Sequence, residues 1–152
     1  MKARKATVED IPFITALARE SYPQYPLDDA EAWCAKIIGL PYAAMFVCGE
    51  SVATVAAQTE FWNPGAPVSD VLPMFGRPSK ANPLGVLKVL SAAADWSRDS
   101  GCYAMRFGSS RGAAAGKRNA IDLMEPFAKR LGAFPWSMTY CLEFERCPLQ
   151  FQ

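Results

Sequence analysis

The chain contains no histidine, so the residues that could do chemistry are its carboxylates, tyrosines, cysteines and lysines. The absence of histidine excludes a Ser-His or Cys-His dyad and most zinc and non-haem iron sites. Any proton transfer must therefore use a carboxylate, Tyr, Cys, Lys, the backbone or water. The five cysteines contain no CxxC pair, which is typical of buried or idle thiols in a reducing compartment. We expect a cytoplasmic protein without a metal site.

Charge is unevenly distributed along the chain. Residues 21–70 hold six acidic residues against Lys36 alone, a balance of −5, whereas residues 71–152 hold eleven basic and six acidic residues, a balance of +5. An acidic half attracts a cation and a basic half attracts an anion, which suits an enzyme that joins an amine to a phosphate-bearing donor. Ordinary solvated surface is the alternative explanation.

The size and hydrophobicity of the chain predict one domain. Its 152 residues are 51% hydrophobic but contain no apolar run long enough to cross a bilayer. The first residues lack the apolar middle section of a secretory signal. We expect a domain over residues 1–146, a short tail over 147–152 and no membrane partner.

The first half of the chain predicts a strand, two helices and a hairpin. We expect a strand at 2–6, and a helix that follows the capping residues Thr7-Val8-Glu9-Asp10 and runs to about Glu20. A second helix follows Asp28 or Asp29 and ends at Gly39. Apolar, β-branched runs at 43–48 and 51–58 flank Gly49-Glu50 and predict an antiparallel hairpin.

The second half predicts three more strands and two more helices. A turn at 61–67 precedes a strand at 68–75, in which Pro73 removes a ladder donor and marks a bulge or an opening. A loop at 76–83, a helix from Leu84 to just before Gly101 and a strand at 103–107 follow. After a basic loop, a helix capped by Asn119 ends at Gly132, and a strand at 138–144 closes the sheet. This order predicts an α/β fold with a mixed sheet.

Several phrases, in this order and spacing, resemble the GNAT N-acetyltransferase superfamily over almost the whole chain. The sequence 4–11 resembles the first strand and helix start of that family, and Arg77-Pro78 lies where the family often has His-Pro or Asn-Pro. Trp96 and Gly101 align without gaps with the tryptophan and glycine that close the central helix. The sequence 127–133 resembles the FYEKLGF signature, and 140–144 resembles the last strand.

The resemblance implies a single-domain, mostly antiparallel mixed sheet with a central splay, flanked by about four helices. It also implies acetyl-CoA as co-substrate. In the family, pantetheine lies in the splay and pairs with the strand that here includes Met74 and Phe75. The family's mechanism is direct attack of an amine on the acetyl thioester.

The loop that holds the CoA pyrophosphate in the family, R-G-x-G-x-G/A, aligns with Ala81-Asn82-Pro83-Leu84-Gly85-Val86. Only one glycine remains, Pro83 lacks an N–H, and Leu84 has a side chain where the backbone must approach phosphate closely. One interpretation is that Arg77, Lys80, Asn82 and the N–H groups of Leu84, Gly85 and Val86 bind phosphate in an altered geometry. The other is that CoA binding has been lost.

The standard catalytic residues of the family are also replaced. Val68 occupies a glutamate position and Ala128 the signature tyrosine position. Asp70, on the same strand face as Val68, or Glu60 could serve instead as the base; the alternative, favoured because carboxylates are mostly exposed, is that Asp70 is a surface or hairpin carboxylate. Tyr140 or Tyr103 could protonate the leaving thiolate, or could be a core residue.

Aromatic residues occur in the two loops that frame the acceptor site in the family, namely Tyr22, Tyr25, Phe61 and Trp62. They could stack on an acceptor or seal the loops onto the core. The basic residues Arg111, Lys117 and Arg118 give too small a footprint to favour nucleic acid.

Two functional hypotheses follow. The first is an N-acetyltransferase that moves an acetyl group from acetyl-CoA to a primary amine of a small molecule or protein. The alternative is a GNAT-fold structural or interaction protein without catalysis, such as a component of a phage virion. Its partners would be further copies of the same chain or other virion proteins.

Overall fold

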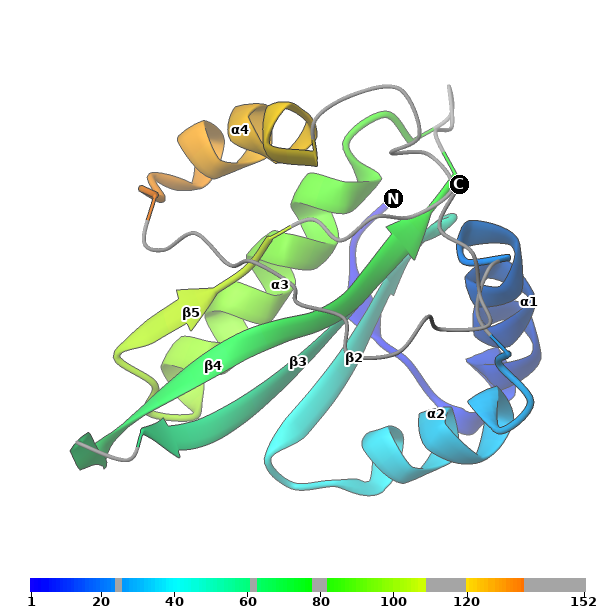
Figure 1. Cartoon of the computed structure of the whole chain (residues 1–152), viewed down its shortest axis with the longest axis horizontal. Coiled ribbons are helices and arrows are strands. Elements are labelled where there is room, and N and C mark those ends of the chain that lie inside the picture. The colour runs from blue at the N-terminus through cyan, green and yellow to red at the C-terminus, as the bar shows by residue number, and fades with distance from the viewer. Residues whose placement is uncertain (24–25, 61–62, 78–81, 109–119, 136–152) are drawn as a thin grey trace, which may run out of the picture.

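The computed structural model is a five-stranded sheet with helices on both of its faces, described for residues 1–23, 26–60, 63–77, 82–108 and 120–135 (Figure 1). The strands are β1 (Arg4–Lys5), β2 (Ala43–Cys48), β3 (Ser51–Glu60), β4 (Asn63–Gly76) and β5 (Ala104–Arg106). The helices are the 3-10 helix η1 (Val8–Asp10), α1 (Ile11–Ser21), α2 (Ala30–Gly39), α3 (Gly85–Asp99) and α4 (Ala120–Leu131). The predicted mixed α/β class is confirmed.

The strands lie in the order β1-β2-β3-β4-β5, and only the last pair is parallel. A two-residue turn joins β2 to β3, with Cys48 opposite Ser51. Gly49 has a φ of 56°, a conformation that glycine adopts without steric cost, and this is the turn the sequence predicts at Gly49-Glu50.

A bulge interrupts β4 at the predicted position. Ala53 pairs with Met74 and Val55 with Val71, so β4 contains one residue more than β3 over this stretch. The extra residue lies at Leu72-Pro73, where the proline cannot donate to the ladder. Because of it, Val71 and Met74 pack against the same core although they are three residues apart.

Each face of the sheet has its own apolar core. Ile14 and Leu17 of α1 and Cys34 and Ile37 of α2 pack on one face against strand residues that include Phe75. Val89 and Ala93 of α3 pack on the other. Neighbouring residues of β2 alternate between the two cores, as strand geometry requires.

The parallel pairing of β4 with β5 is short. It joins Val68 to Ala104, Ser69 to Met105 and Asp70 to Arg106, after which β5 ends while β4 continues to Gly76. Within the described residues, the second half of β4 therefore has no ladder partner on its β5 side. This is the strand separation that the GNAT resemblance implies as a central splay.

The helix and turn boundaries differ from the predictions at two places. The turn predicted at 61–67 is wrong in extent, because β4 begins at Asn63, which pairs with Glu60. The pairing is irregular there, with a register shift between Gln58 and Glu60 opposite the stretch that contains Pro64 and Pro67. Helix α3 begins at Gly85, since Leu84 is its N-cap residue. The strand predicted at 138–144 lies outside the described residues.

Among the described residues, no helix combines the length and apolar character needed to cross a membrane.

The junction between β1 and α1 is held by a charged cap. Asp10 accepts a hydrogen bond from the Thr7 backbone N–H at 2.8 Å and forms two hydrogen bonds of 2.7 Å with the Arg4 guanidinium. These bonds, Arg4 first, lower the pKa of Asp10 from 3.8 to about 2. The contact therefore stabilises the folded state when Asp10 is ionised.

We predict that Asp10→Asn lowers the free energy of unfolding by about 1 to 2 kcal/mol at neutral pH, because it removes the charge that both donors bind. Since the pKa of Asp10 is lowered on folding, the wild-type advantage should be complete above about pH 4 and disappear as the pH falls to about 2. Urea unfolding at both pH values measures the difference. Asp95→Asn, at an ion pair whose side chains are mostly exposed, is the control and should change stability little.

Candidate functional site

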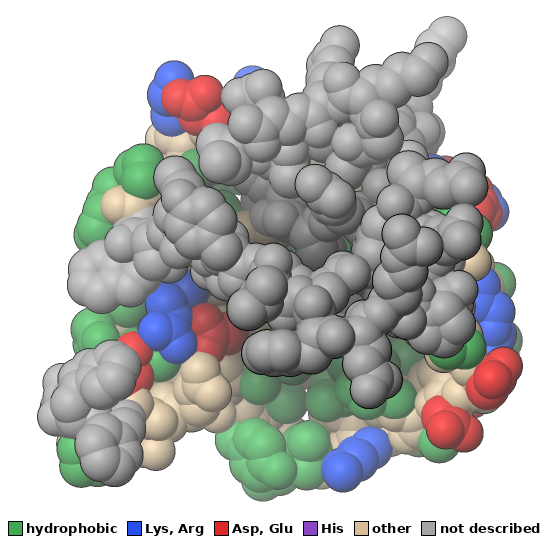
Figure 2. All heavy atoms as spheres, viewed as in Figure 1, with side chains coloured by type: hydrophobic (Ala, Val, Ile, Leu, Met, Phe, Trp, Pro, Cys, Tyr) green, Lys and Arg blue, Asp and Glu red, His purple; other side chains and the backbone are tan. Residues whose placement is uncertain are grey.

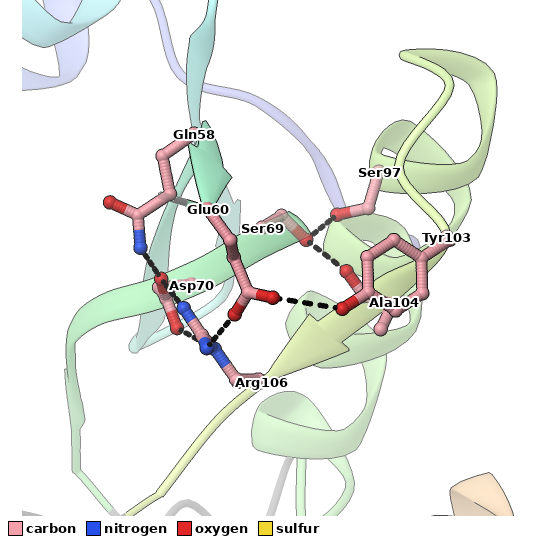
Figure 3. Close-up of polar contacts among 8 residues, drawn as sticks. All are labelled: Gln58, Glu60, Ser69, Asp70, Ser97, Tyr103, Ala104 and Arg106. Carbon is pink, nitrogen blue, oxygen red and sulfur yellow. Dashed lines mark hydrogen bonds and ion pairs between the residues drawn. The ribbon is translucent and has the colours of Figure 1, made fainter. Parts of the chain in front are cut away.

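A cluster of charged side chains lies where β4 and β5 separate (Figure 3). Arg106 binds Asp70 through Nε at 2.7 Å and Nη2 at 2.8 Å, and binds Glu60 through Nη1 at 2.7 Å. One guanidinium thus joins β3, β4 and β5. On the face shown in Figure 2, basic side chains lie directly against acidic ones over this part of the sheet.

Strand register explains this convergence. Asp70 lies opposite Ala56 on β3 and opposite Arg106 on β5, so all three point to the same face of the sheet. Gln58 and Glu60 follow on that face at intervals of two residues. This is the face opposite α3, since Ser69, the residue before Asp70, donates to Ser97 of α3 at 2.7 Å.

Two further side chains complete the cluster. Gln58 donates its amide to Asp70, and the Tyr103 hydroxyl donates to Glu60 at 3.1 Å (Figure 3). The side chains of Glu60, Asp70 and Arg106 are 11%, 27% and 33% exposed. The carboxylates predicted as bases therefore lie together, but a cation occupies both of them.

The protonation states follow from these contacts. Asp70, with help from Glu60, raises the pKa of Arg106 above its usual value, so the guanidinium keeps its charge. Desolvation and the bond to Glu60 raise the pKa of Tyr103, so the phenol keeps its proton. Tyr103 is thus in the acid form that the sequence hypothesis requires of a proton donor, whereas Tyr140 lies outside the described residues.

Arg77, predicted to bind phosphate, is held by two carboxylates. It binds both oxygens of Glu20, with the Nε–Oε1 distance 2.7 Å, and its Nη1 lies 2.9 Å from Glu50 Oε1. Its backbone N–H donates to the Glu50 carbonyl at 3.0 Å. These carboxylates raise the pKa of Arg77, and the residue fastens the end of β4 to α1 and to the β2–β3 turn.

The start of α3 is seated on the β2–β3 hairpin. Asn82 is buried and donates its amide to the Cys48 carbonyl at 3.0 Å. A Cβ on Gly85 would lie 2.4 Å from Ser51 Oγ, so a glycine is required for this approach. The Gly85 N–H donates to the Asn82 carbonyl at 3.1 Å. Asn82 and Gly85 therefore hold the start of α3 against the β2–β3 hairpin, whereas the GNAT resemblance implies that they bind the cofactor.

The first turn of α3 keeps features that suit an anion. A helix leaves its first N–H groups for external acceptors, and here Val86 and Leu87 supply them. Leu84, at the N-cap, is 39% exposed. Lys88, which is not part of the motif that the sequence suggests, lies in the same turn with its Nζ 3.3 Å from Asn82 Oδ1. Its position three residues after Gly85 was the available signal.

The other predicted residues lie on β4, at the end of α1 or outside the described residues. Phe75 is buried in the core and meets the Tyr22 ring edge-on, with centroids 6.1 Å apart. The Tyr22 hydroxyl donates to the Met74 carbonyl at 3.0 Å, so Tyr22 fastens the end of α1 to β4. Tyr25, Phe61, Trp62 and Lys80 lie outside the described residues.

Within the described residues, no group of His, Cys, Asp and Glu side chains could hold a metal ion.

Comparison with known proteins finds a likeness in structure alone. No protein-family model matches the chain, and no curated protein sequence matches it. Solved structures do match over nearly the whole length. The aminoglycoside N-acetyltransferase AAC(6')-Iy, in complex with a CoA bisubstrate analogue, has a TM-score of 0.74 at 18% identity, covering 96% of this chain and 98% of that one.

Two further structures span a range of roles. An acetyltransferase of Trypanosoma brucei has a TM-score of 0.71 at 18% identity, covering 94% of this chain and 99% of that one. A transcriptional regulator of Bacillus halodurans has a TM-score of 0.70 at 11% identity, with the same coverages. The chain therefore has the fold of the GNAT N-acetyltransferases.

We predict that Gly85→Ala destabilises the fold by about 1 to 3 kcal/mol, because the new methyl group overlaps Ser51 and Asn82 and must push α3 from the hairpin. Thermal unfolding measures the loss. Gly39→Ala is the matched control, since a Cβ there meets no atom within 4 Å and alanine favours a helix. Equal stability of the two variants would contradict the tight seating of α3.

Proposed function

We propose that this chain is an N-acetyltransferase that transfers the acetyl group of acetyl-CoA to a primary amine. The observation that carries the proposal is the separation of β4 from β5 after Asp70 and Arg106, which leaves the backbone of residues 71–76 without a ladder partner on one side within the described chain. In the GNAT fold, pantetheine pairs with this strand. AAC(6')-Iy, which shares the fold, has been solved with CoA.

The cofactor would lie along β4 and end at α3. Backbone groups near the bulge at Leu72-Pro73 would hold the pantetheine arm and polarise the thioester carbonyl. The N–H groups of Val86 and Leu87, with the charge of Lys88, would bind the diphosphate in place of the missing glycine loop. Arg77 and Asn82 support this arrangement indirectly, because their side chains hold the loop ends.

In the reaction, the neutral amine attacks the thioester carbonyl and the C–S bond breaks. The attacking nitrogen must then lose a proton, and the leaving thiolate must gain one. Arg106 occupies the carboxylates of Asp70 and Glu60, so neither is free to take the proton while the cluster is closed. We therefore assign proton removal to water. Tyr103, whose phenol is protonated at neutral pH, is the described candidate for donating a proton to the thiolate, for which its hydroxyl would have to leave Glu60.

We predict that acetyl-CoA binds the wild-type chain in isothermal titration and that incubation with primary amines yields acetylated product. Product should be measured by mass spectrometry, because the five cysteines would react with a thiol reagent. Val86→Pro removes a first-turn N–H at the helix position that Pro12 already occupies in α1, so the helix should persist. Its dissociation constant for acetyl-CoA should rise about tenfold.

Val86→Ala, which keeps the N–H, separates this effect from loss of the side chain and should weaken binding less than Val86→Pro. Wild-type protein that gives no heat with millimolar acetyl-CoA would overturn the proposal.

A second candidate is a GNAT-fold binding or structural module without catalysis. It is favoured by a specific observation: Asp70, Glu60 and Arg77 are all committed to internal ion pairs. This candidate predicts a folded protein that neither binds acetyl-CoA nor forms product with any amine.

A further inference from the structure

We propose that Arg106 is a positioning residue that fixes the point where β4 and β5 separate, and so sets the width of the slot for the acyl donor. The proposal rests on the acetyltransferase function proposed above.

The location of Arg106 carries the first step. Asp70 and Arg106 form the last register pair of the parallel ladder, and β5 ends at Arg106. An ion pair at this position ties the strands together one residue before they part. The side-chain contact therefore lies at the closed end of the separation, where the paired part of the two strands meets the unpaired part.

The geometry of the contact carries the second step. Arg106 binds Asp70 through two nitrogen atoms in a fork, and uses its third nitrogen for Glu60 on β3. A planar guanidinium bound at three nitrogens has little freedom to rotate. It therefore fixes the distance from β5 to β4 and to β3 at once.

The surroundings of the contact carry the third step. Among the described residues, three register pairs and the bond from the Tyr103 N–H to the Pro67 carbonyl join β5 and its preceding residue to β4 through the backbone, and Met105 packs into the core on the α3 side. The Arg106 bonds are the ion pairs that join β5 to both β4 and β3. Gln58 and Tyr103 each bind one of the carboxylates, which limits how far either can turn away from Arg106. Glu60 is 11% exposed, so solvent screens its bond to Arg106 less than it would on an open surface.

The test compares Arg106→Met with Arg106→Lys and with Arg98→Met. Methionine keeps much of the side-chain length but removes the charge, whereas lysine keeps the charge and loses the fork. Arg98 also pairs with an aspartate, but on the exposed surface of α3 and away from the slot, so Arg98→Met is the matched control.

The first measurement is hydrogen exchange of the cofactor-free protein. Amides of residues 68–70 and 104–106 should exchange faster in Arg106→Met than in wild type, with Arg106→Lys between them and Arg98→Met unchanged. Equal protection of these amides in Arg106→Met and wild type would overturn the proposed role of Arg106 in holding β4 and β5 together.

The second measurement is steady-state kinetics with acetyl-CoA. If loss of the Arg106 bonds reduces the fraction of molecules with the native separation of β4 and β5 to about a tenth, the KM for acetyl-CoA should rise about tenfold in Arg106→Met. The kcat at saturating acetyl-CoA should be retained. Arg106→Lys should recover part of the loss. A merely structural role would lower kcat through the folded fraction and leave the KM unchanged, and that result would overturn the proposal.

The two failures are distinguishable. Wild-type protein that binds no acetyl-CoA overturns the proposed function and, with it, the slot. Wild-type protein that binds and turns over acetyl-CoA normally, beside an Arg106→Met variant with the same KM, overturns only the role of Arg106.

Discussion

The separation of two parallel strands is the constraint on which the rest of the site depends. A parallel ladder satisfies backbone donors and acceptors on both strands. Within the described residues this ladder ends after three register pairs, so the rest of β4 has no ladder partner on that side, although its Met74 carbonyl accepts a hydrogen bond from the Tyr22 hydroxyl. Backbone polar groups are costly to leave without a partner when they are removed from water. A ligand with amide groups spaced along an extended chain can take the place of the missing strand, and pantetheine is such a ligand.

Two devices shape this opening from opposite ends. The bulge at Leu72-Pro73 changes the direction of β4 and removes one donor, so that β3 continues to pair while the other edge of β4 diverges. At the end of the opening where β4 and β5 are still paired, Arg106 holds β3, β4 and β5 together through its ion pairs with Glu60 and Asp70. The same ion pairs occupy the carboxylates, which is why the residues best placed for base chemistry are not the ones we assign to it.

The sequence predicted the fold well because its signals were local. Gly49-Glu50 specified the turn, Pro73 specified the bulge, and Gly101 and Gly132 marked the ends of α3 and α4, where both have positive φ. The site was predicted less well, because its contacts join residues far apart in the chain. Asp70 and Glu60 could be identified as carboxylates, but their pairing with Arg106 depends on the register of β4 against β5, which local patterns do not contain. The aligned loop and its basic neighbours predict phosphate contacts for Asn82 and Arg77, whereas the Arg77 side chain binds Glu20 and Glu50 and the Asn82 amide donates to the Cys48 carbonyl.

The β2–β3 turn also bears on the order in which the chain folds. Gly76 lies so close to the turn that a Cβ would be 2.4 Å from the Glu50 carbonyl, and Gly85 approaches Ser51 equally closely. The turn closes over two residues, which is fast, whereas docking the end of β4 and the start of α3 requires closing longer loops. We therefore expect the β2–β3 hairpin to form early and act as the surface on which both segments assemble. An insertion in this turn would then impair docking of the end of β4 and the start of α3 as well as formation of the hairpin.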